Sequence, residues 1–246
     1  MDPKTFKKKS VFRVAPNIAL IKYWGKFEEN DILPLNSSLS LTLSTDDLYT
    51  ETSVTMSNSY LQDSLLLNGA AQTLLSPRLL KILSYFRATC KLPADYFFKI
   101  KSHNSFPTAA GLASSASGYA AIAICLSDLL NFVEEYPGHL TEIARIGSGS
   151  ACRSLHGGMV EWQGVPEEYL TEKNREFLMK ENIVFNEVEK KNLDSFCIAT
   201  QVFEPKVFDD FRILVLVAHP NEKEVGSTDG MKISVKTSDL LWVHKT

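Results

Sequence analysis

The chain has 246 residues, of which 44% are hydrophobic and 22% are charged, and its formal net charge at pH 7 is -3. This is enough for one substantial core, or for one domain and part of a second. The charge gives no reason to expect nucleic-acid binding, no apolar stretch reaches the ~20 residues of a membrane span, and no secretory signal is visible. We therefore expect a cytoplasmic globular protein.

The first part of the chain predicts strands followed by a helix. The strand-like segments are residues 11–15, 38–43, 49–55 and 64–67. Asn68 and Gly69 form a typical hairpin turn. A helix should then begin with Ser76 as its cap and Pro77 at its first position. A run of three lysines at 7–9 precedes these elements, and we interpret it as part of a solvated, frayed terminus.

The second part mixes strands and helices, which indicates an α+β domain. Its predicted elements are a strand at 96–100, a long helix with apolar positions from Leu112 to Leu130, a helix at 140–146, and strands at 159–162, 196–202 and 211–218. Residues 163–194 hold many charges and no apolar period long enough to build a core. We interpret them as a surface insertion, in part disordered.

Residues 107–119, PTAAGLASSASGY, form a loop of small residues that leads into the long helix. Gly111 allows the backbone to approach a ligand, Ser114 and Ser115 add hydroxyls, and the N–H groups of the first helical turn have no intrahelical partners. Such a helix start attracts anions. The segment is either a phosphate-binding loop or an ordinary small-residue helix start packed against a sheet.

Two further segments carry groups that suit an anionic ligand. Residues 15–26, APNIALIKYWGK, combine an amide, two lysines, a tyrosine and a tryptophan, and residues 147–158, GSGSACRSLHGG, combine glycines with serines and Arg153. The plain alternatives are a strand with a snorkelling lysine and a flexible surface turn. The four cysteines, Cys90, Cys125, Cys152 and Cys197, are too scattered for zinc or a disulfide scaffold, so reduced thiols are expected.

Together, these three segments resemble the signature segments of the mevalonate diphosphate decarboxylases, in the GHMP small-molecule kinase superfamily. The resemblance continues through residues 33–47, Trp162 and residues 224–238, in the family's order. It implies a fold like domain 2 of ribosomal protein S5, with an ATP- and substrate-binding N-terminal domain at 1–225. Residues 226–246 would start a C-terminal domain that is mostly absent, and full-length relatives would be homodimers.

The family's chemistry would be the ATP- and Mg2+-dependent decarboxylation of (R)-5-diphosphomevalonate. The resemblance implies catalytic roles for Lys22 near the transferred phosphoryl group, for Ser115 at the magnesium ion and for Arg153 at the substrate carboxylate. It implies a substrate site formed by Tyr23, Trp24, Gly25, Lys26, Arg78, Ser148, Gly149, Ser150, Ala151, Cys152, Arg153 and Thr228. The ATP site would comprise Asn104, Pro107, Ala110, Gly111, Leu112, Ala113, Ser114 and Ser115.

The sequence departs from the family pattern in one respect. The family's general-base aspartate lies in a DAGPN-type string, and the 246 residues contain no such string. Three interpretations stay open on the sequence alone: a decarboxylase represented by a fragment, a shortened isoform or an incomplete gene model; a relative that binds ligand without turnover; and another GHMP kinase that does not decarboxylate its product.

Overall fold

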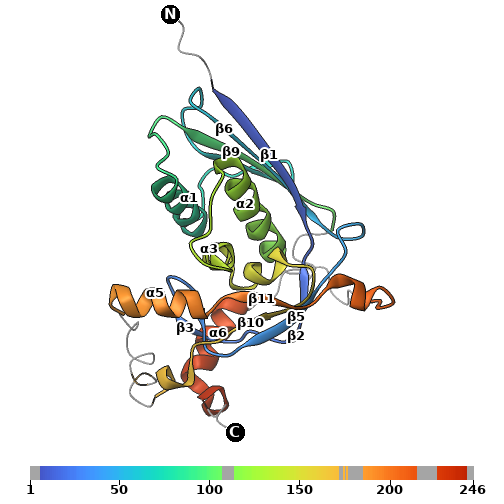
Figure 1. The fold of residues 1–246 in the computed structure, drawn as a ribbon, viewed down its shortest axis with the longest axis vertical. Coiled ribbons are helices and arrows are strands. Elements are labelled where there is room, and N and C mark those ends of the chain that lie inside the picture. Colours follow the sequence, from blue (N-terminus) through green and yellow to red (C-terminus); the bar gives the residue numbers. More distant parts are fainter. Residues whose placement is uncertain are drawn as a thin grey trace, which may run out of the picture.

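The computed structural model describes residues 6–106, 114–171, 174, 176, 185–214 and 226–242. In these residues the chain forms a five-stranded sheet, a four-stranded sheet and a two-stranded hairpin, with helices packed beside them (Figure 1). This mixed arrangement confirms the predicted α+β fold class. Among the described helices none is long and apolar enough to cross a membrane.

The five-stranded sheet has the order β1-β6-β9-β7-β8. Its strands are β1 (Lys7–Val14), β6 (Thr50–Ser57), β9 (Phe97–Asn104), β7 (Ser64–Leu67) and β8 (Ala70–Ala71). The expected turn joins β7 to β8, with φ of +47° at Asn68 and +83° at Gly69. Both residues tolerate this left-handed region better than most, which explains the pairing of Leu67 with Ala70.

The lysine run at 7–9 is not a frayed tail, so that interpretation was wrong. All three lysines lie in β1, where Lys7, Lys8 and Lys9 pair with Ser57, Met56 and Thr55 of β6. The Lys8 ammonium also donates to the carbonyl oxygen of Leu129 at 2.6 Å. The backbone ladder with β6 satisfies the peptide groups of this segment, while Lys7 and Lys9 keep their charges exposed to water.

Helices α1 (Pro77–Thr89), α2 (Ser114–Leu130) and α3 (His139–Gly147) lie on one face of this sheet (Figure 1). The predicted start of α1 is confirmed, because Ser76 Oγ accepts a hydrogen bond from the Leu79 N–H and Pro77 is the first helical residue. Apolar positions of α1 at Leu79, Ile82, Leu83 and Phe86 pack into the main core with side chains of β6, β9, α2 and α3.

The second sheet has the order β11-β10-β5-β2. Its strands are β11 (Ala199–Phe203), β10 (Gly158–Trp162), β5 (Ser38–Thr42) and β2 (Asn17–Ile21), and the hairpin consists of β3 (Lys26–Glu28) and β4 (Leu33–Pro34). A 3-10 helix, η1 (Gly149–Leu155), connects α3 to β10. The structure also contains three more 3-10 turns, η2 (Glu167–Tyr169), η3 (Pro205–Phe208) and η4 (Asp239–Trp242), and helix α6 (Ser227–Thr237).

Two strand predictions near the end of the chain need correction. The strand predicted at 196–202 begins at Ala199 instead, because Phe196 is the last residue of helix α5 (Glu187–Phe196). The strand predicted at 211–218 is not formed by residues 211–214, and residues 215–218 lie outside the described part. Phe211 and Leu214 are 61% and 83% exposed, so the described start of this apolar run is not packed into a core.

The expectation that residues 163–194 build no core is wrong for the described residues of this segment, while the interpretation of the segment as an insertion stays a prediction. Asn186 caps α5 in a complete capping box with Glu189, and Leu193 of this helix is buried. Val165 is buried as well, and the ring of Phe185 stacks on Phe27 at 5.6 Å. A short helix with few apolar positions therefore completes a core cluster that a search for long apolar periods does not detect.

Glu142, in the first turn of α3, links stability to pH. Burial raises the pKa of Glu142 to about 7, although Arg145 lies close enough to oppose the shift. A carboxyl group with a raised folded-state pKa favours folding while it is protonated, and this contribution falls as pH rises from about 4.5 to about 7. We predict that Glu142→Gln raises the free energy of unfolding at pH 8 by roughly 1–3 kcal/mol.

The measurement is urea unfolding of both proteins at pH 5 and pH 8. The variant should match the parent at pH 5, where Glu142 is already neutral, and exceed it at pH 8. An equal difference at both values would contradict the assigned protonation.

Candidate active site

A cavity of about 350 Å³ lies where β2, the β3–β4 hairpin, α1, α2, η1 and α6 meet. We call it the anion cavity. Its lining residues are Asn17, Ile18, Ala19, Lys22, Tyr23, Trp24, Lys26, Ile32, Arg78, Ser115, Ser148, Gly149, Ser150, Arg153, Ser227, Thr228 and Met231. They come from stretches that are far apart in the chain, so only the folded protein assembles them.

The charges of the anion cavity have one sign. Lys22, Lys26, Arg78 and Arg153 line it, and no carboxylate does so among the described lining residues. Lys26 is 7% exposed and is partly compensated from outside the lining, because its ammonium lies 2.5 Å from a carboxylate oxygen of Glu29. The remaining positive charge suits a ligand with several anionic groups.

Arg153 is held by neutral groups. The residue is 2% exposed, and its guanidinium donates to Ser40 Oγ at 3.0 Å, to Ser38 Oγ at 2.7 Å and to Asn17 Oδ1 at 3.3 Å. Burial lowers the pKa of Arg153, but an arginine stays charged in proteins. The hydroxyls and the amide thus fix its orientation without neutralising it, which leaves its charge available to a ligand.

Tyr23 offers a hydrogen-bond donor without a partner among the described residues. The residue is 8% exposed, its ring packs against Trp162 with a centroid distance of 4.7 Å, and its hydroxyl has no hydrogen-bond partner among the described residues. Burial raises the pKa of Tyr23, so the phenol keeps its proton. An unsatisfied buried donor is costly, and a ligand oxygen in the cavity would satisfy it.

Helix α6 closes one side of the anion cavity. Trp24 Nε1 donates to Ser234 Oγ of α6 at 3.0 Å, and the Trp24 N–H donates to Asn36 Oδ1 at 3.1 Å. Ser227, Thr228 and Met231 of the same helix line the cavity. Residues assigned to two different predicted domains therefore share one site.

Ser115 joins the predicted phosphate-binding segment to this cavity. It lies in the first turn of α2, and its hydroxyl is 3.2 Å from that of Ser148. The predicted ATP-site residues Pro107, Ala110, Gly111, Leu112 and Ala113 lie outside the described residues. Asn104 is buried, accepts a hydrogen bond from Thr50 Oγ1 at 2.7 Å and does not line the cavity, and neither does Ser114.

Three predicted substrate residues support the cavity without lining it, namely Gly25, Ala151 and Cys152. Gly25 has φ of +108°, a conformation that favours glycine. It also packs against Leu35, so that a Cβ on residue 25 would lie only 2.9 Å from Leu35 Cδ1. The Cys152 thiol donates to the Gly149 carbonyl at 3.0 Å, and burial raises its pKa to about 12. This agrees with a packing role and not with a reactive thiolate.

The structure brings the other predicted substrate residues together with Lys22 and Ser115, and their individual roles stay predictions. It also adds lining residues that the sequence analysis did not select, Asn17, Ile18, Ala19, Ile32, Ser227 and Met231. Asn17 stood in a segment already recognised for its polar groups, so it could have been found. Ile32 could not, because an apolar residue in a hairpin gives no sign that it faces a cavity.

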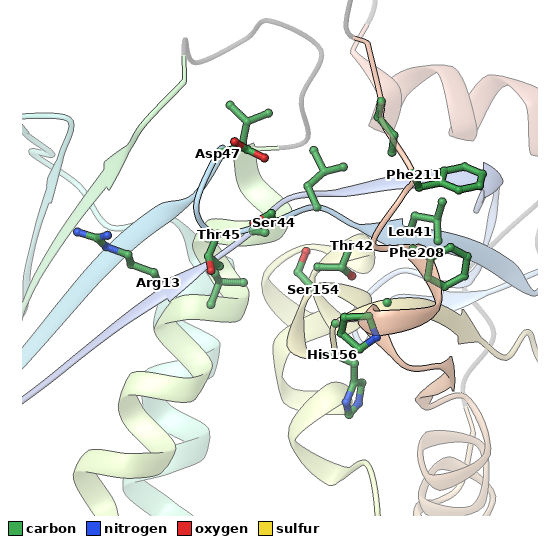
Figure 2. A pocket seen from close by; sticks show the side chains of 18 of the residues that line it. Arg13, Leu41, Thr42, Ser44, Thr45, Asp47, Ser154, His156, Phe208 and Phe211 are labelled. Carbon is green, nitrogen blue, oxygen red and sulfur yellow. The ribbon is translucent and has the colours of Figure 1, made fainter.

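A larger hollow of about 920 Å³ lies elsewhere, and its described lining contains none of the predicted site residues (Figure 2). Figure 2 shows Leu41, Phe208 and Phe211 together on one side of it and Arg13 on the opposite side. The Arg13 guanidinium is paired with Glu51 at 2.7 Å, so its charge is already compensated. We assign the site to the smaller anion cavity, because four cations line it and no carboxylate does so among its described lining residues, whereas Asp47 and Asp209 line the larger hollow.

A preformed cationic cavity with an unsatisfied donor, built on an α+β domain, defines a protein that binds an anionic small molecule. Comparison with known proteins narrows this class. A family model for the diphosphomevalonate decarboxylase-like N-terminal domain matches residues 14–169, and one for the mevalonate 5-diphosphate decarboxylase C-terminal domain matches residues 213–246. The chain belongs to the diphosphomevalonate decarboxylase family, which confirms the predicted resemblance. The predicted domain boundary at 225/226 stays a prediction.

Individual relatives agree with this assignment. The diphosphomevalonate decarboxylase of Danio rerio is 44% identical over 234 residues, which are 92% of this chain and 52% of that protein. The mevalonate diphosphate decarboxylase structure from Staphylococcus aureus is 33% identical with a TM-score of 0.72, covering 96% of this chain and 62% of that one. A structure described as MDDEF in complex with MVAPP, AMPPCP and magnesium is 36% identical with a TM-score of 0.70, with the same coverage. The chain spans about half the length of the curated relatives it matches.

Gly149 forms part of the cavity wall, and its substitution tests how tightly that wall is packed. A Cβ at this position would lie 2.9 Å from Tyr23 Cε1 and 3.1 Å from both Ile32 Cγ2 and Trp162 Cη2. We predict that Gly149→Ala lowers the free energy of unfolding by roughly 1–3 kcal/mol, because three buried side chains would have to move. Urea unfolding measures the change.

The matched control is Gly118→Ala in helix α2, where a Cβ would meet nothing within 4 Å. This change should stabilise the protein by roughly 0.5–1 kcal/mol, since alanine loses less backbone entropy than glycine in a helix. If Gly149→Ala were as well tolerated as the control, the tight wall around Gly149 would be refuted.

Proposed function

We propose that this protein serves the ATP-dependent decarboxylation of (R)-5-diphosphomevalonate to isopentenyl diphosphate, the mevalonate-pathway step that supplies isoprenoid and sterol synthesis. The observation that carries the proposal is the anion cavity, where four cations and the free hydroxyl of Tyr23 converge without a lining carboxylate among the described residues. The names of the related proteins and the ligands of the related structure support it.

The charge of the reactants explains the need for such a cavity. The substrate carries a diphosphate and a carboxylate, and ATP brings further negative charge into the same space. Without compensation, their mutual repulsion in a partly dry cleft would prevent binding. Lys26, Arg78 and the Tyr23 hydroxyl would receive the diphosphate, since together they supply two positive charges and a neutral donor to the cavity.

Arg153 and Lys22 would act nearer the reacting groups. The rigid Arg153 guanidinium would face the substrate carboxylate, and its hydroxyl partners would prevent it from turning away as charge redistributes. Lys22 is exposed, with its ammonium 5.9 Å from the centre of the Trp24 ring, so it can reach a phosphoryl group that enters from the open side. A cation there would stabilise the charge that accumulates during transfer.

A magnesium ion would be held by the Ser115 hydroxyl together with phosphate oxygens of the nucleotide. This fits the residues present, because the described lining offers hydroxyl oxygens at Ser115 and Ser148, and magnesium accepts few protein ligands when phosphates and water supply the rest. When bound, the ion would neutralise charge on the nucleotide phosphates.

The cavity assignment predicts the effect of removing single cations. Arg153→Ala and Lys26→Ala should each weaken diphosphomevalonate binding roughly ten- to hundredfold, the amount expected for one lost charged hydrogen bond. Isothermal titration calorimetry measures the affinities. Arg13→Ala is the matched control, because Arg13 is an exposed arginine outside the anion cavity and its loss should leave the affinity unchanged. Unchanged affinity in both cavity variants would mean that the diphosphate binds elsewhere.

A second candidate function is ligand binding without turnover. It is favoured by the lack of a carboxylate in the described lining and of a DAGPN-like string in the 246 residues, since a base is needed to accept or orient the proton of the 3-hydroxyl. If this function holds, the 246-residue chain should bind nucleotide but release carbon dioxide about 10²–10⁴-fold more slowly than a full-length relative.

Release of labelled carbon dioxide from diphosphomevalonate and ATP decides between the two functions. The full-length Danio rerio relative, assayed at the same concentration, provides the reference. A rate equal to that of the relative would exclude the binding-only function and show that these residues supply the proton acceptor themselves.

A further inference from the structure

The turn between β3 and β4 adopts an unfavourable backbone conformation next to the anion cavity. Ile32 has φ of +55°, a region that a β-branched residue rarely enters, and it is only 1% exposed. Its side chain lines the cavity and lies against Gly149. A conformation of this kind persists only where surrounding contacts impose it, and such residues concentrate at functional sites.

The β3–β4 turn is held by contacts within the hairpin and by a contact from helix α3. The two carboxylate oxygens of Glu28 accept hydrogen bonds from the N–H groups of Asn30 at 2.7 Å and Asp31 at 2.6 Å. From α3, Arg145 Nε donates to the Asp31 carbonyl oxygen at 2.9 Å. The backbone on both sides of Asp31 is therefore tied down directly before Ile32.

The Asp31 side chain adds a bridge between two helices. Its carboxylate lies 2.5 Å from the ammonium of Lys81 on α1 and 2.6 Å from that of Lys190 on α5. Burial raises the pKa of Asp31, but the hydrogen bonds and charges of these two lysines outweigh it, and the pKa lies below its usual value. Asp31 is therefore ionised at neutral pH and attracts both helices to the turn.

Helix α5 reaches the same network a second time through Asp194. Arg145 is fully buried and forms an ion pair with Asp194, and its Nη1 donates to the Cys197 carbonyl at 2.8 Å. Arg145 lies close before Ser148 and Gly149, which line the cavity. Helix α5, most of which lies in the 163–194 segment, thus contacts both Asp31 beside Ile32 and Arg145 before Ser148 and Gly149.

We propose that Asp31 is a positioning residue of the anion cavity, and that α5, through Lys190, holds the β3–β4 turn so that Ile32 and Lys26 face the ligand. The identity of that ligand rests on the proposed function. Loss of the Lys190 bond lets the turn relax toward an ordinary backbone conformation. The Lys26 ammonium then moves with its strand, and the diphosphate loses an optimally placed cation.

The test uses three single substitutions at Lys190 and Lys191, together with Asp31→Asn alone and combined with Lys190→Gln, in the 246-residue chain. Lys190→Gln removes the bond to Asp31, and Lys190→Arg keeps a cation that can donate to the same carboxylate. Lys191→Gln is the matched control, since Lys191 is the next residue of α5, its side chain is 70% exposed, and its ion-pair partner is Glu135. Calorimetry gives the affinity for diphosphomevalonate, for pyrophosphate and for the magnesium complex of AMPPCP, and thermal unfolding monitors stability.

We expect Lys190→Gln to weaken diphosphomevalonate and pyrophosphate binding about three- to tenfold. The reason is that the Lys26 ammonium would be displaced by a fraction of an ångström from its position toward the ligand. AMPPCP affinity should stay unchanged, Lys190→Arg should restore the parental value, and Lys191→Gln should show no effect. Combining Lys190→Gln with Asp31→Asn should add little to the larger single effect, because both changes remove the same bond.

Other outcomes overturn the proposal. Equal affinities for Lys190→Gln and Lys191→Gln would show that α5 does not position the cavity, and a parallel loss of affinity for all three ligands with lowered stability would show a general structural role. Failure of the proposed function has a different result: diphosphomevalonate would not bind, while pyrophosphate would still show the predicted order of variants. A parental chain that binds neither probe would overturn both proposals.

Discussion

The structure depends on holding several positive charges close together around the anion cavity. Arg153 meets this constraint through Ser38, Ser40 and Asn17, which supply only neutral acceptors. A carboxylate partner would stabilise the guanidinium further, but it would also cancel the charge that an anionic ligand needs. The four-stranded sheet places these hydroxyls, because Ser38 and Ser40 stand two residues apart on β5 and therefore face the same side.

Acidic residues are not missing from this region. They support the anion cavity from behind. Glu28 receives the backbone N–H groups of the β3–β4 turn, Asp31 receives two lysines, and Asp194 receives Arg145. Each of these three carboxylates is thus matched by a partner outside the lining, whereas Glu29 pairs with Lys26 in the lining. This separation gives the wall its rigidity and leaves the lining positive.

The described part of the 163–194 segment shows how a helix with little apolar surface becomes structural. Leu193 contributes its side chain to a core cluster, and the polar residues of α5 contribute ion pairs to Asp31 and Arg145. The segment therefore stabilises the hairpin that carries Lys26. A family comparison that concentrates on the ligand-binding segments would not assign it any part in the site.

Local patterns in the sequence determined much of this protein. The start of α1, the Asn68–Gly69 turn, the strand expected at 96–100 and the polar composition of the three signature segments are properties of neighbouring residues, so short-range stereochemistry and the family resemblance were enough to predict them. The tertiary structure alone decided that Ile32 lines the cavity in a left-handed conformation, that Lys7 to Lys9 pair in an edge strand, and that α5 supports the site. The reason is physical: each of these features depends on contacts between residues 45 or more positions apart in the chain, such as Asp31 with Lys81 and Lys190, and no local pattern records which distant partner will satisfy a charge or a backbone group.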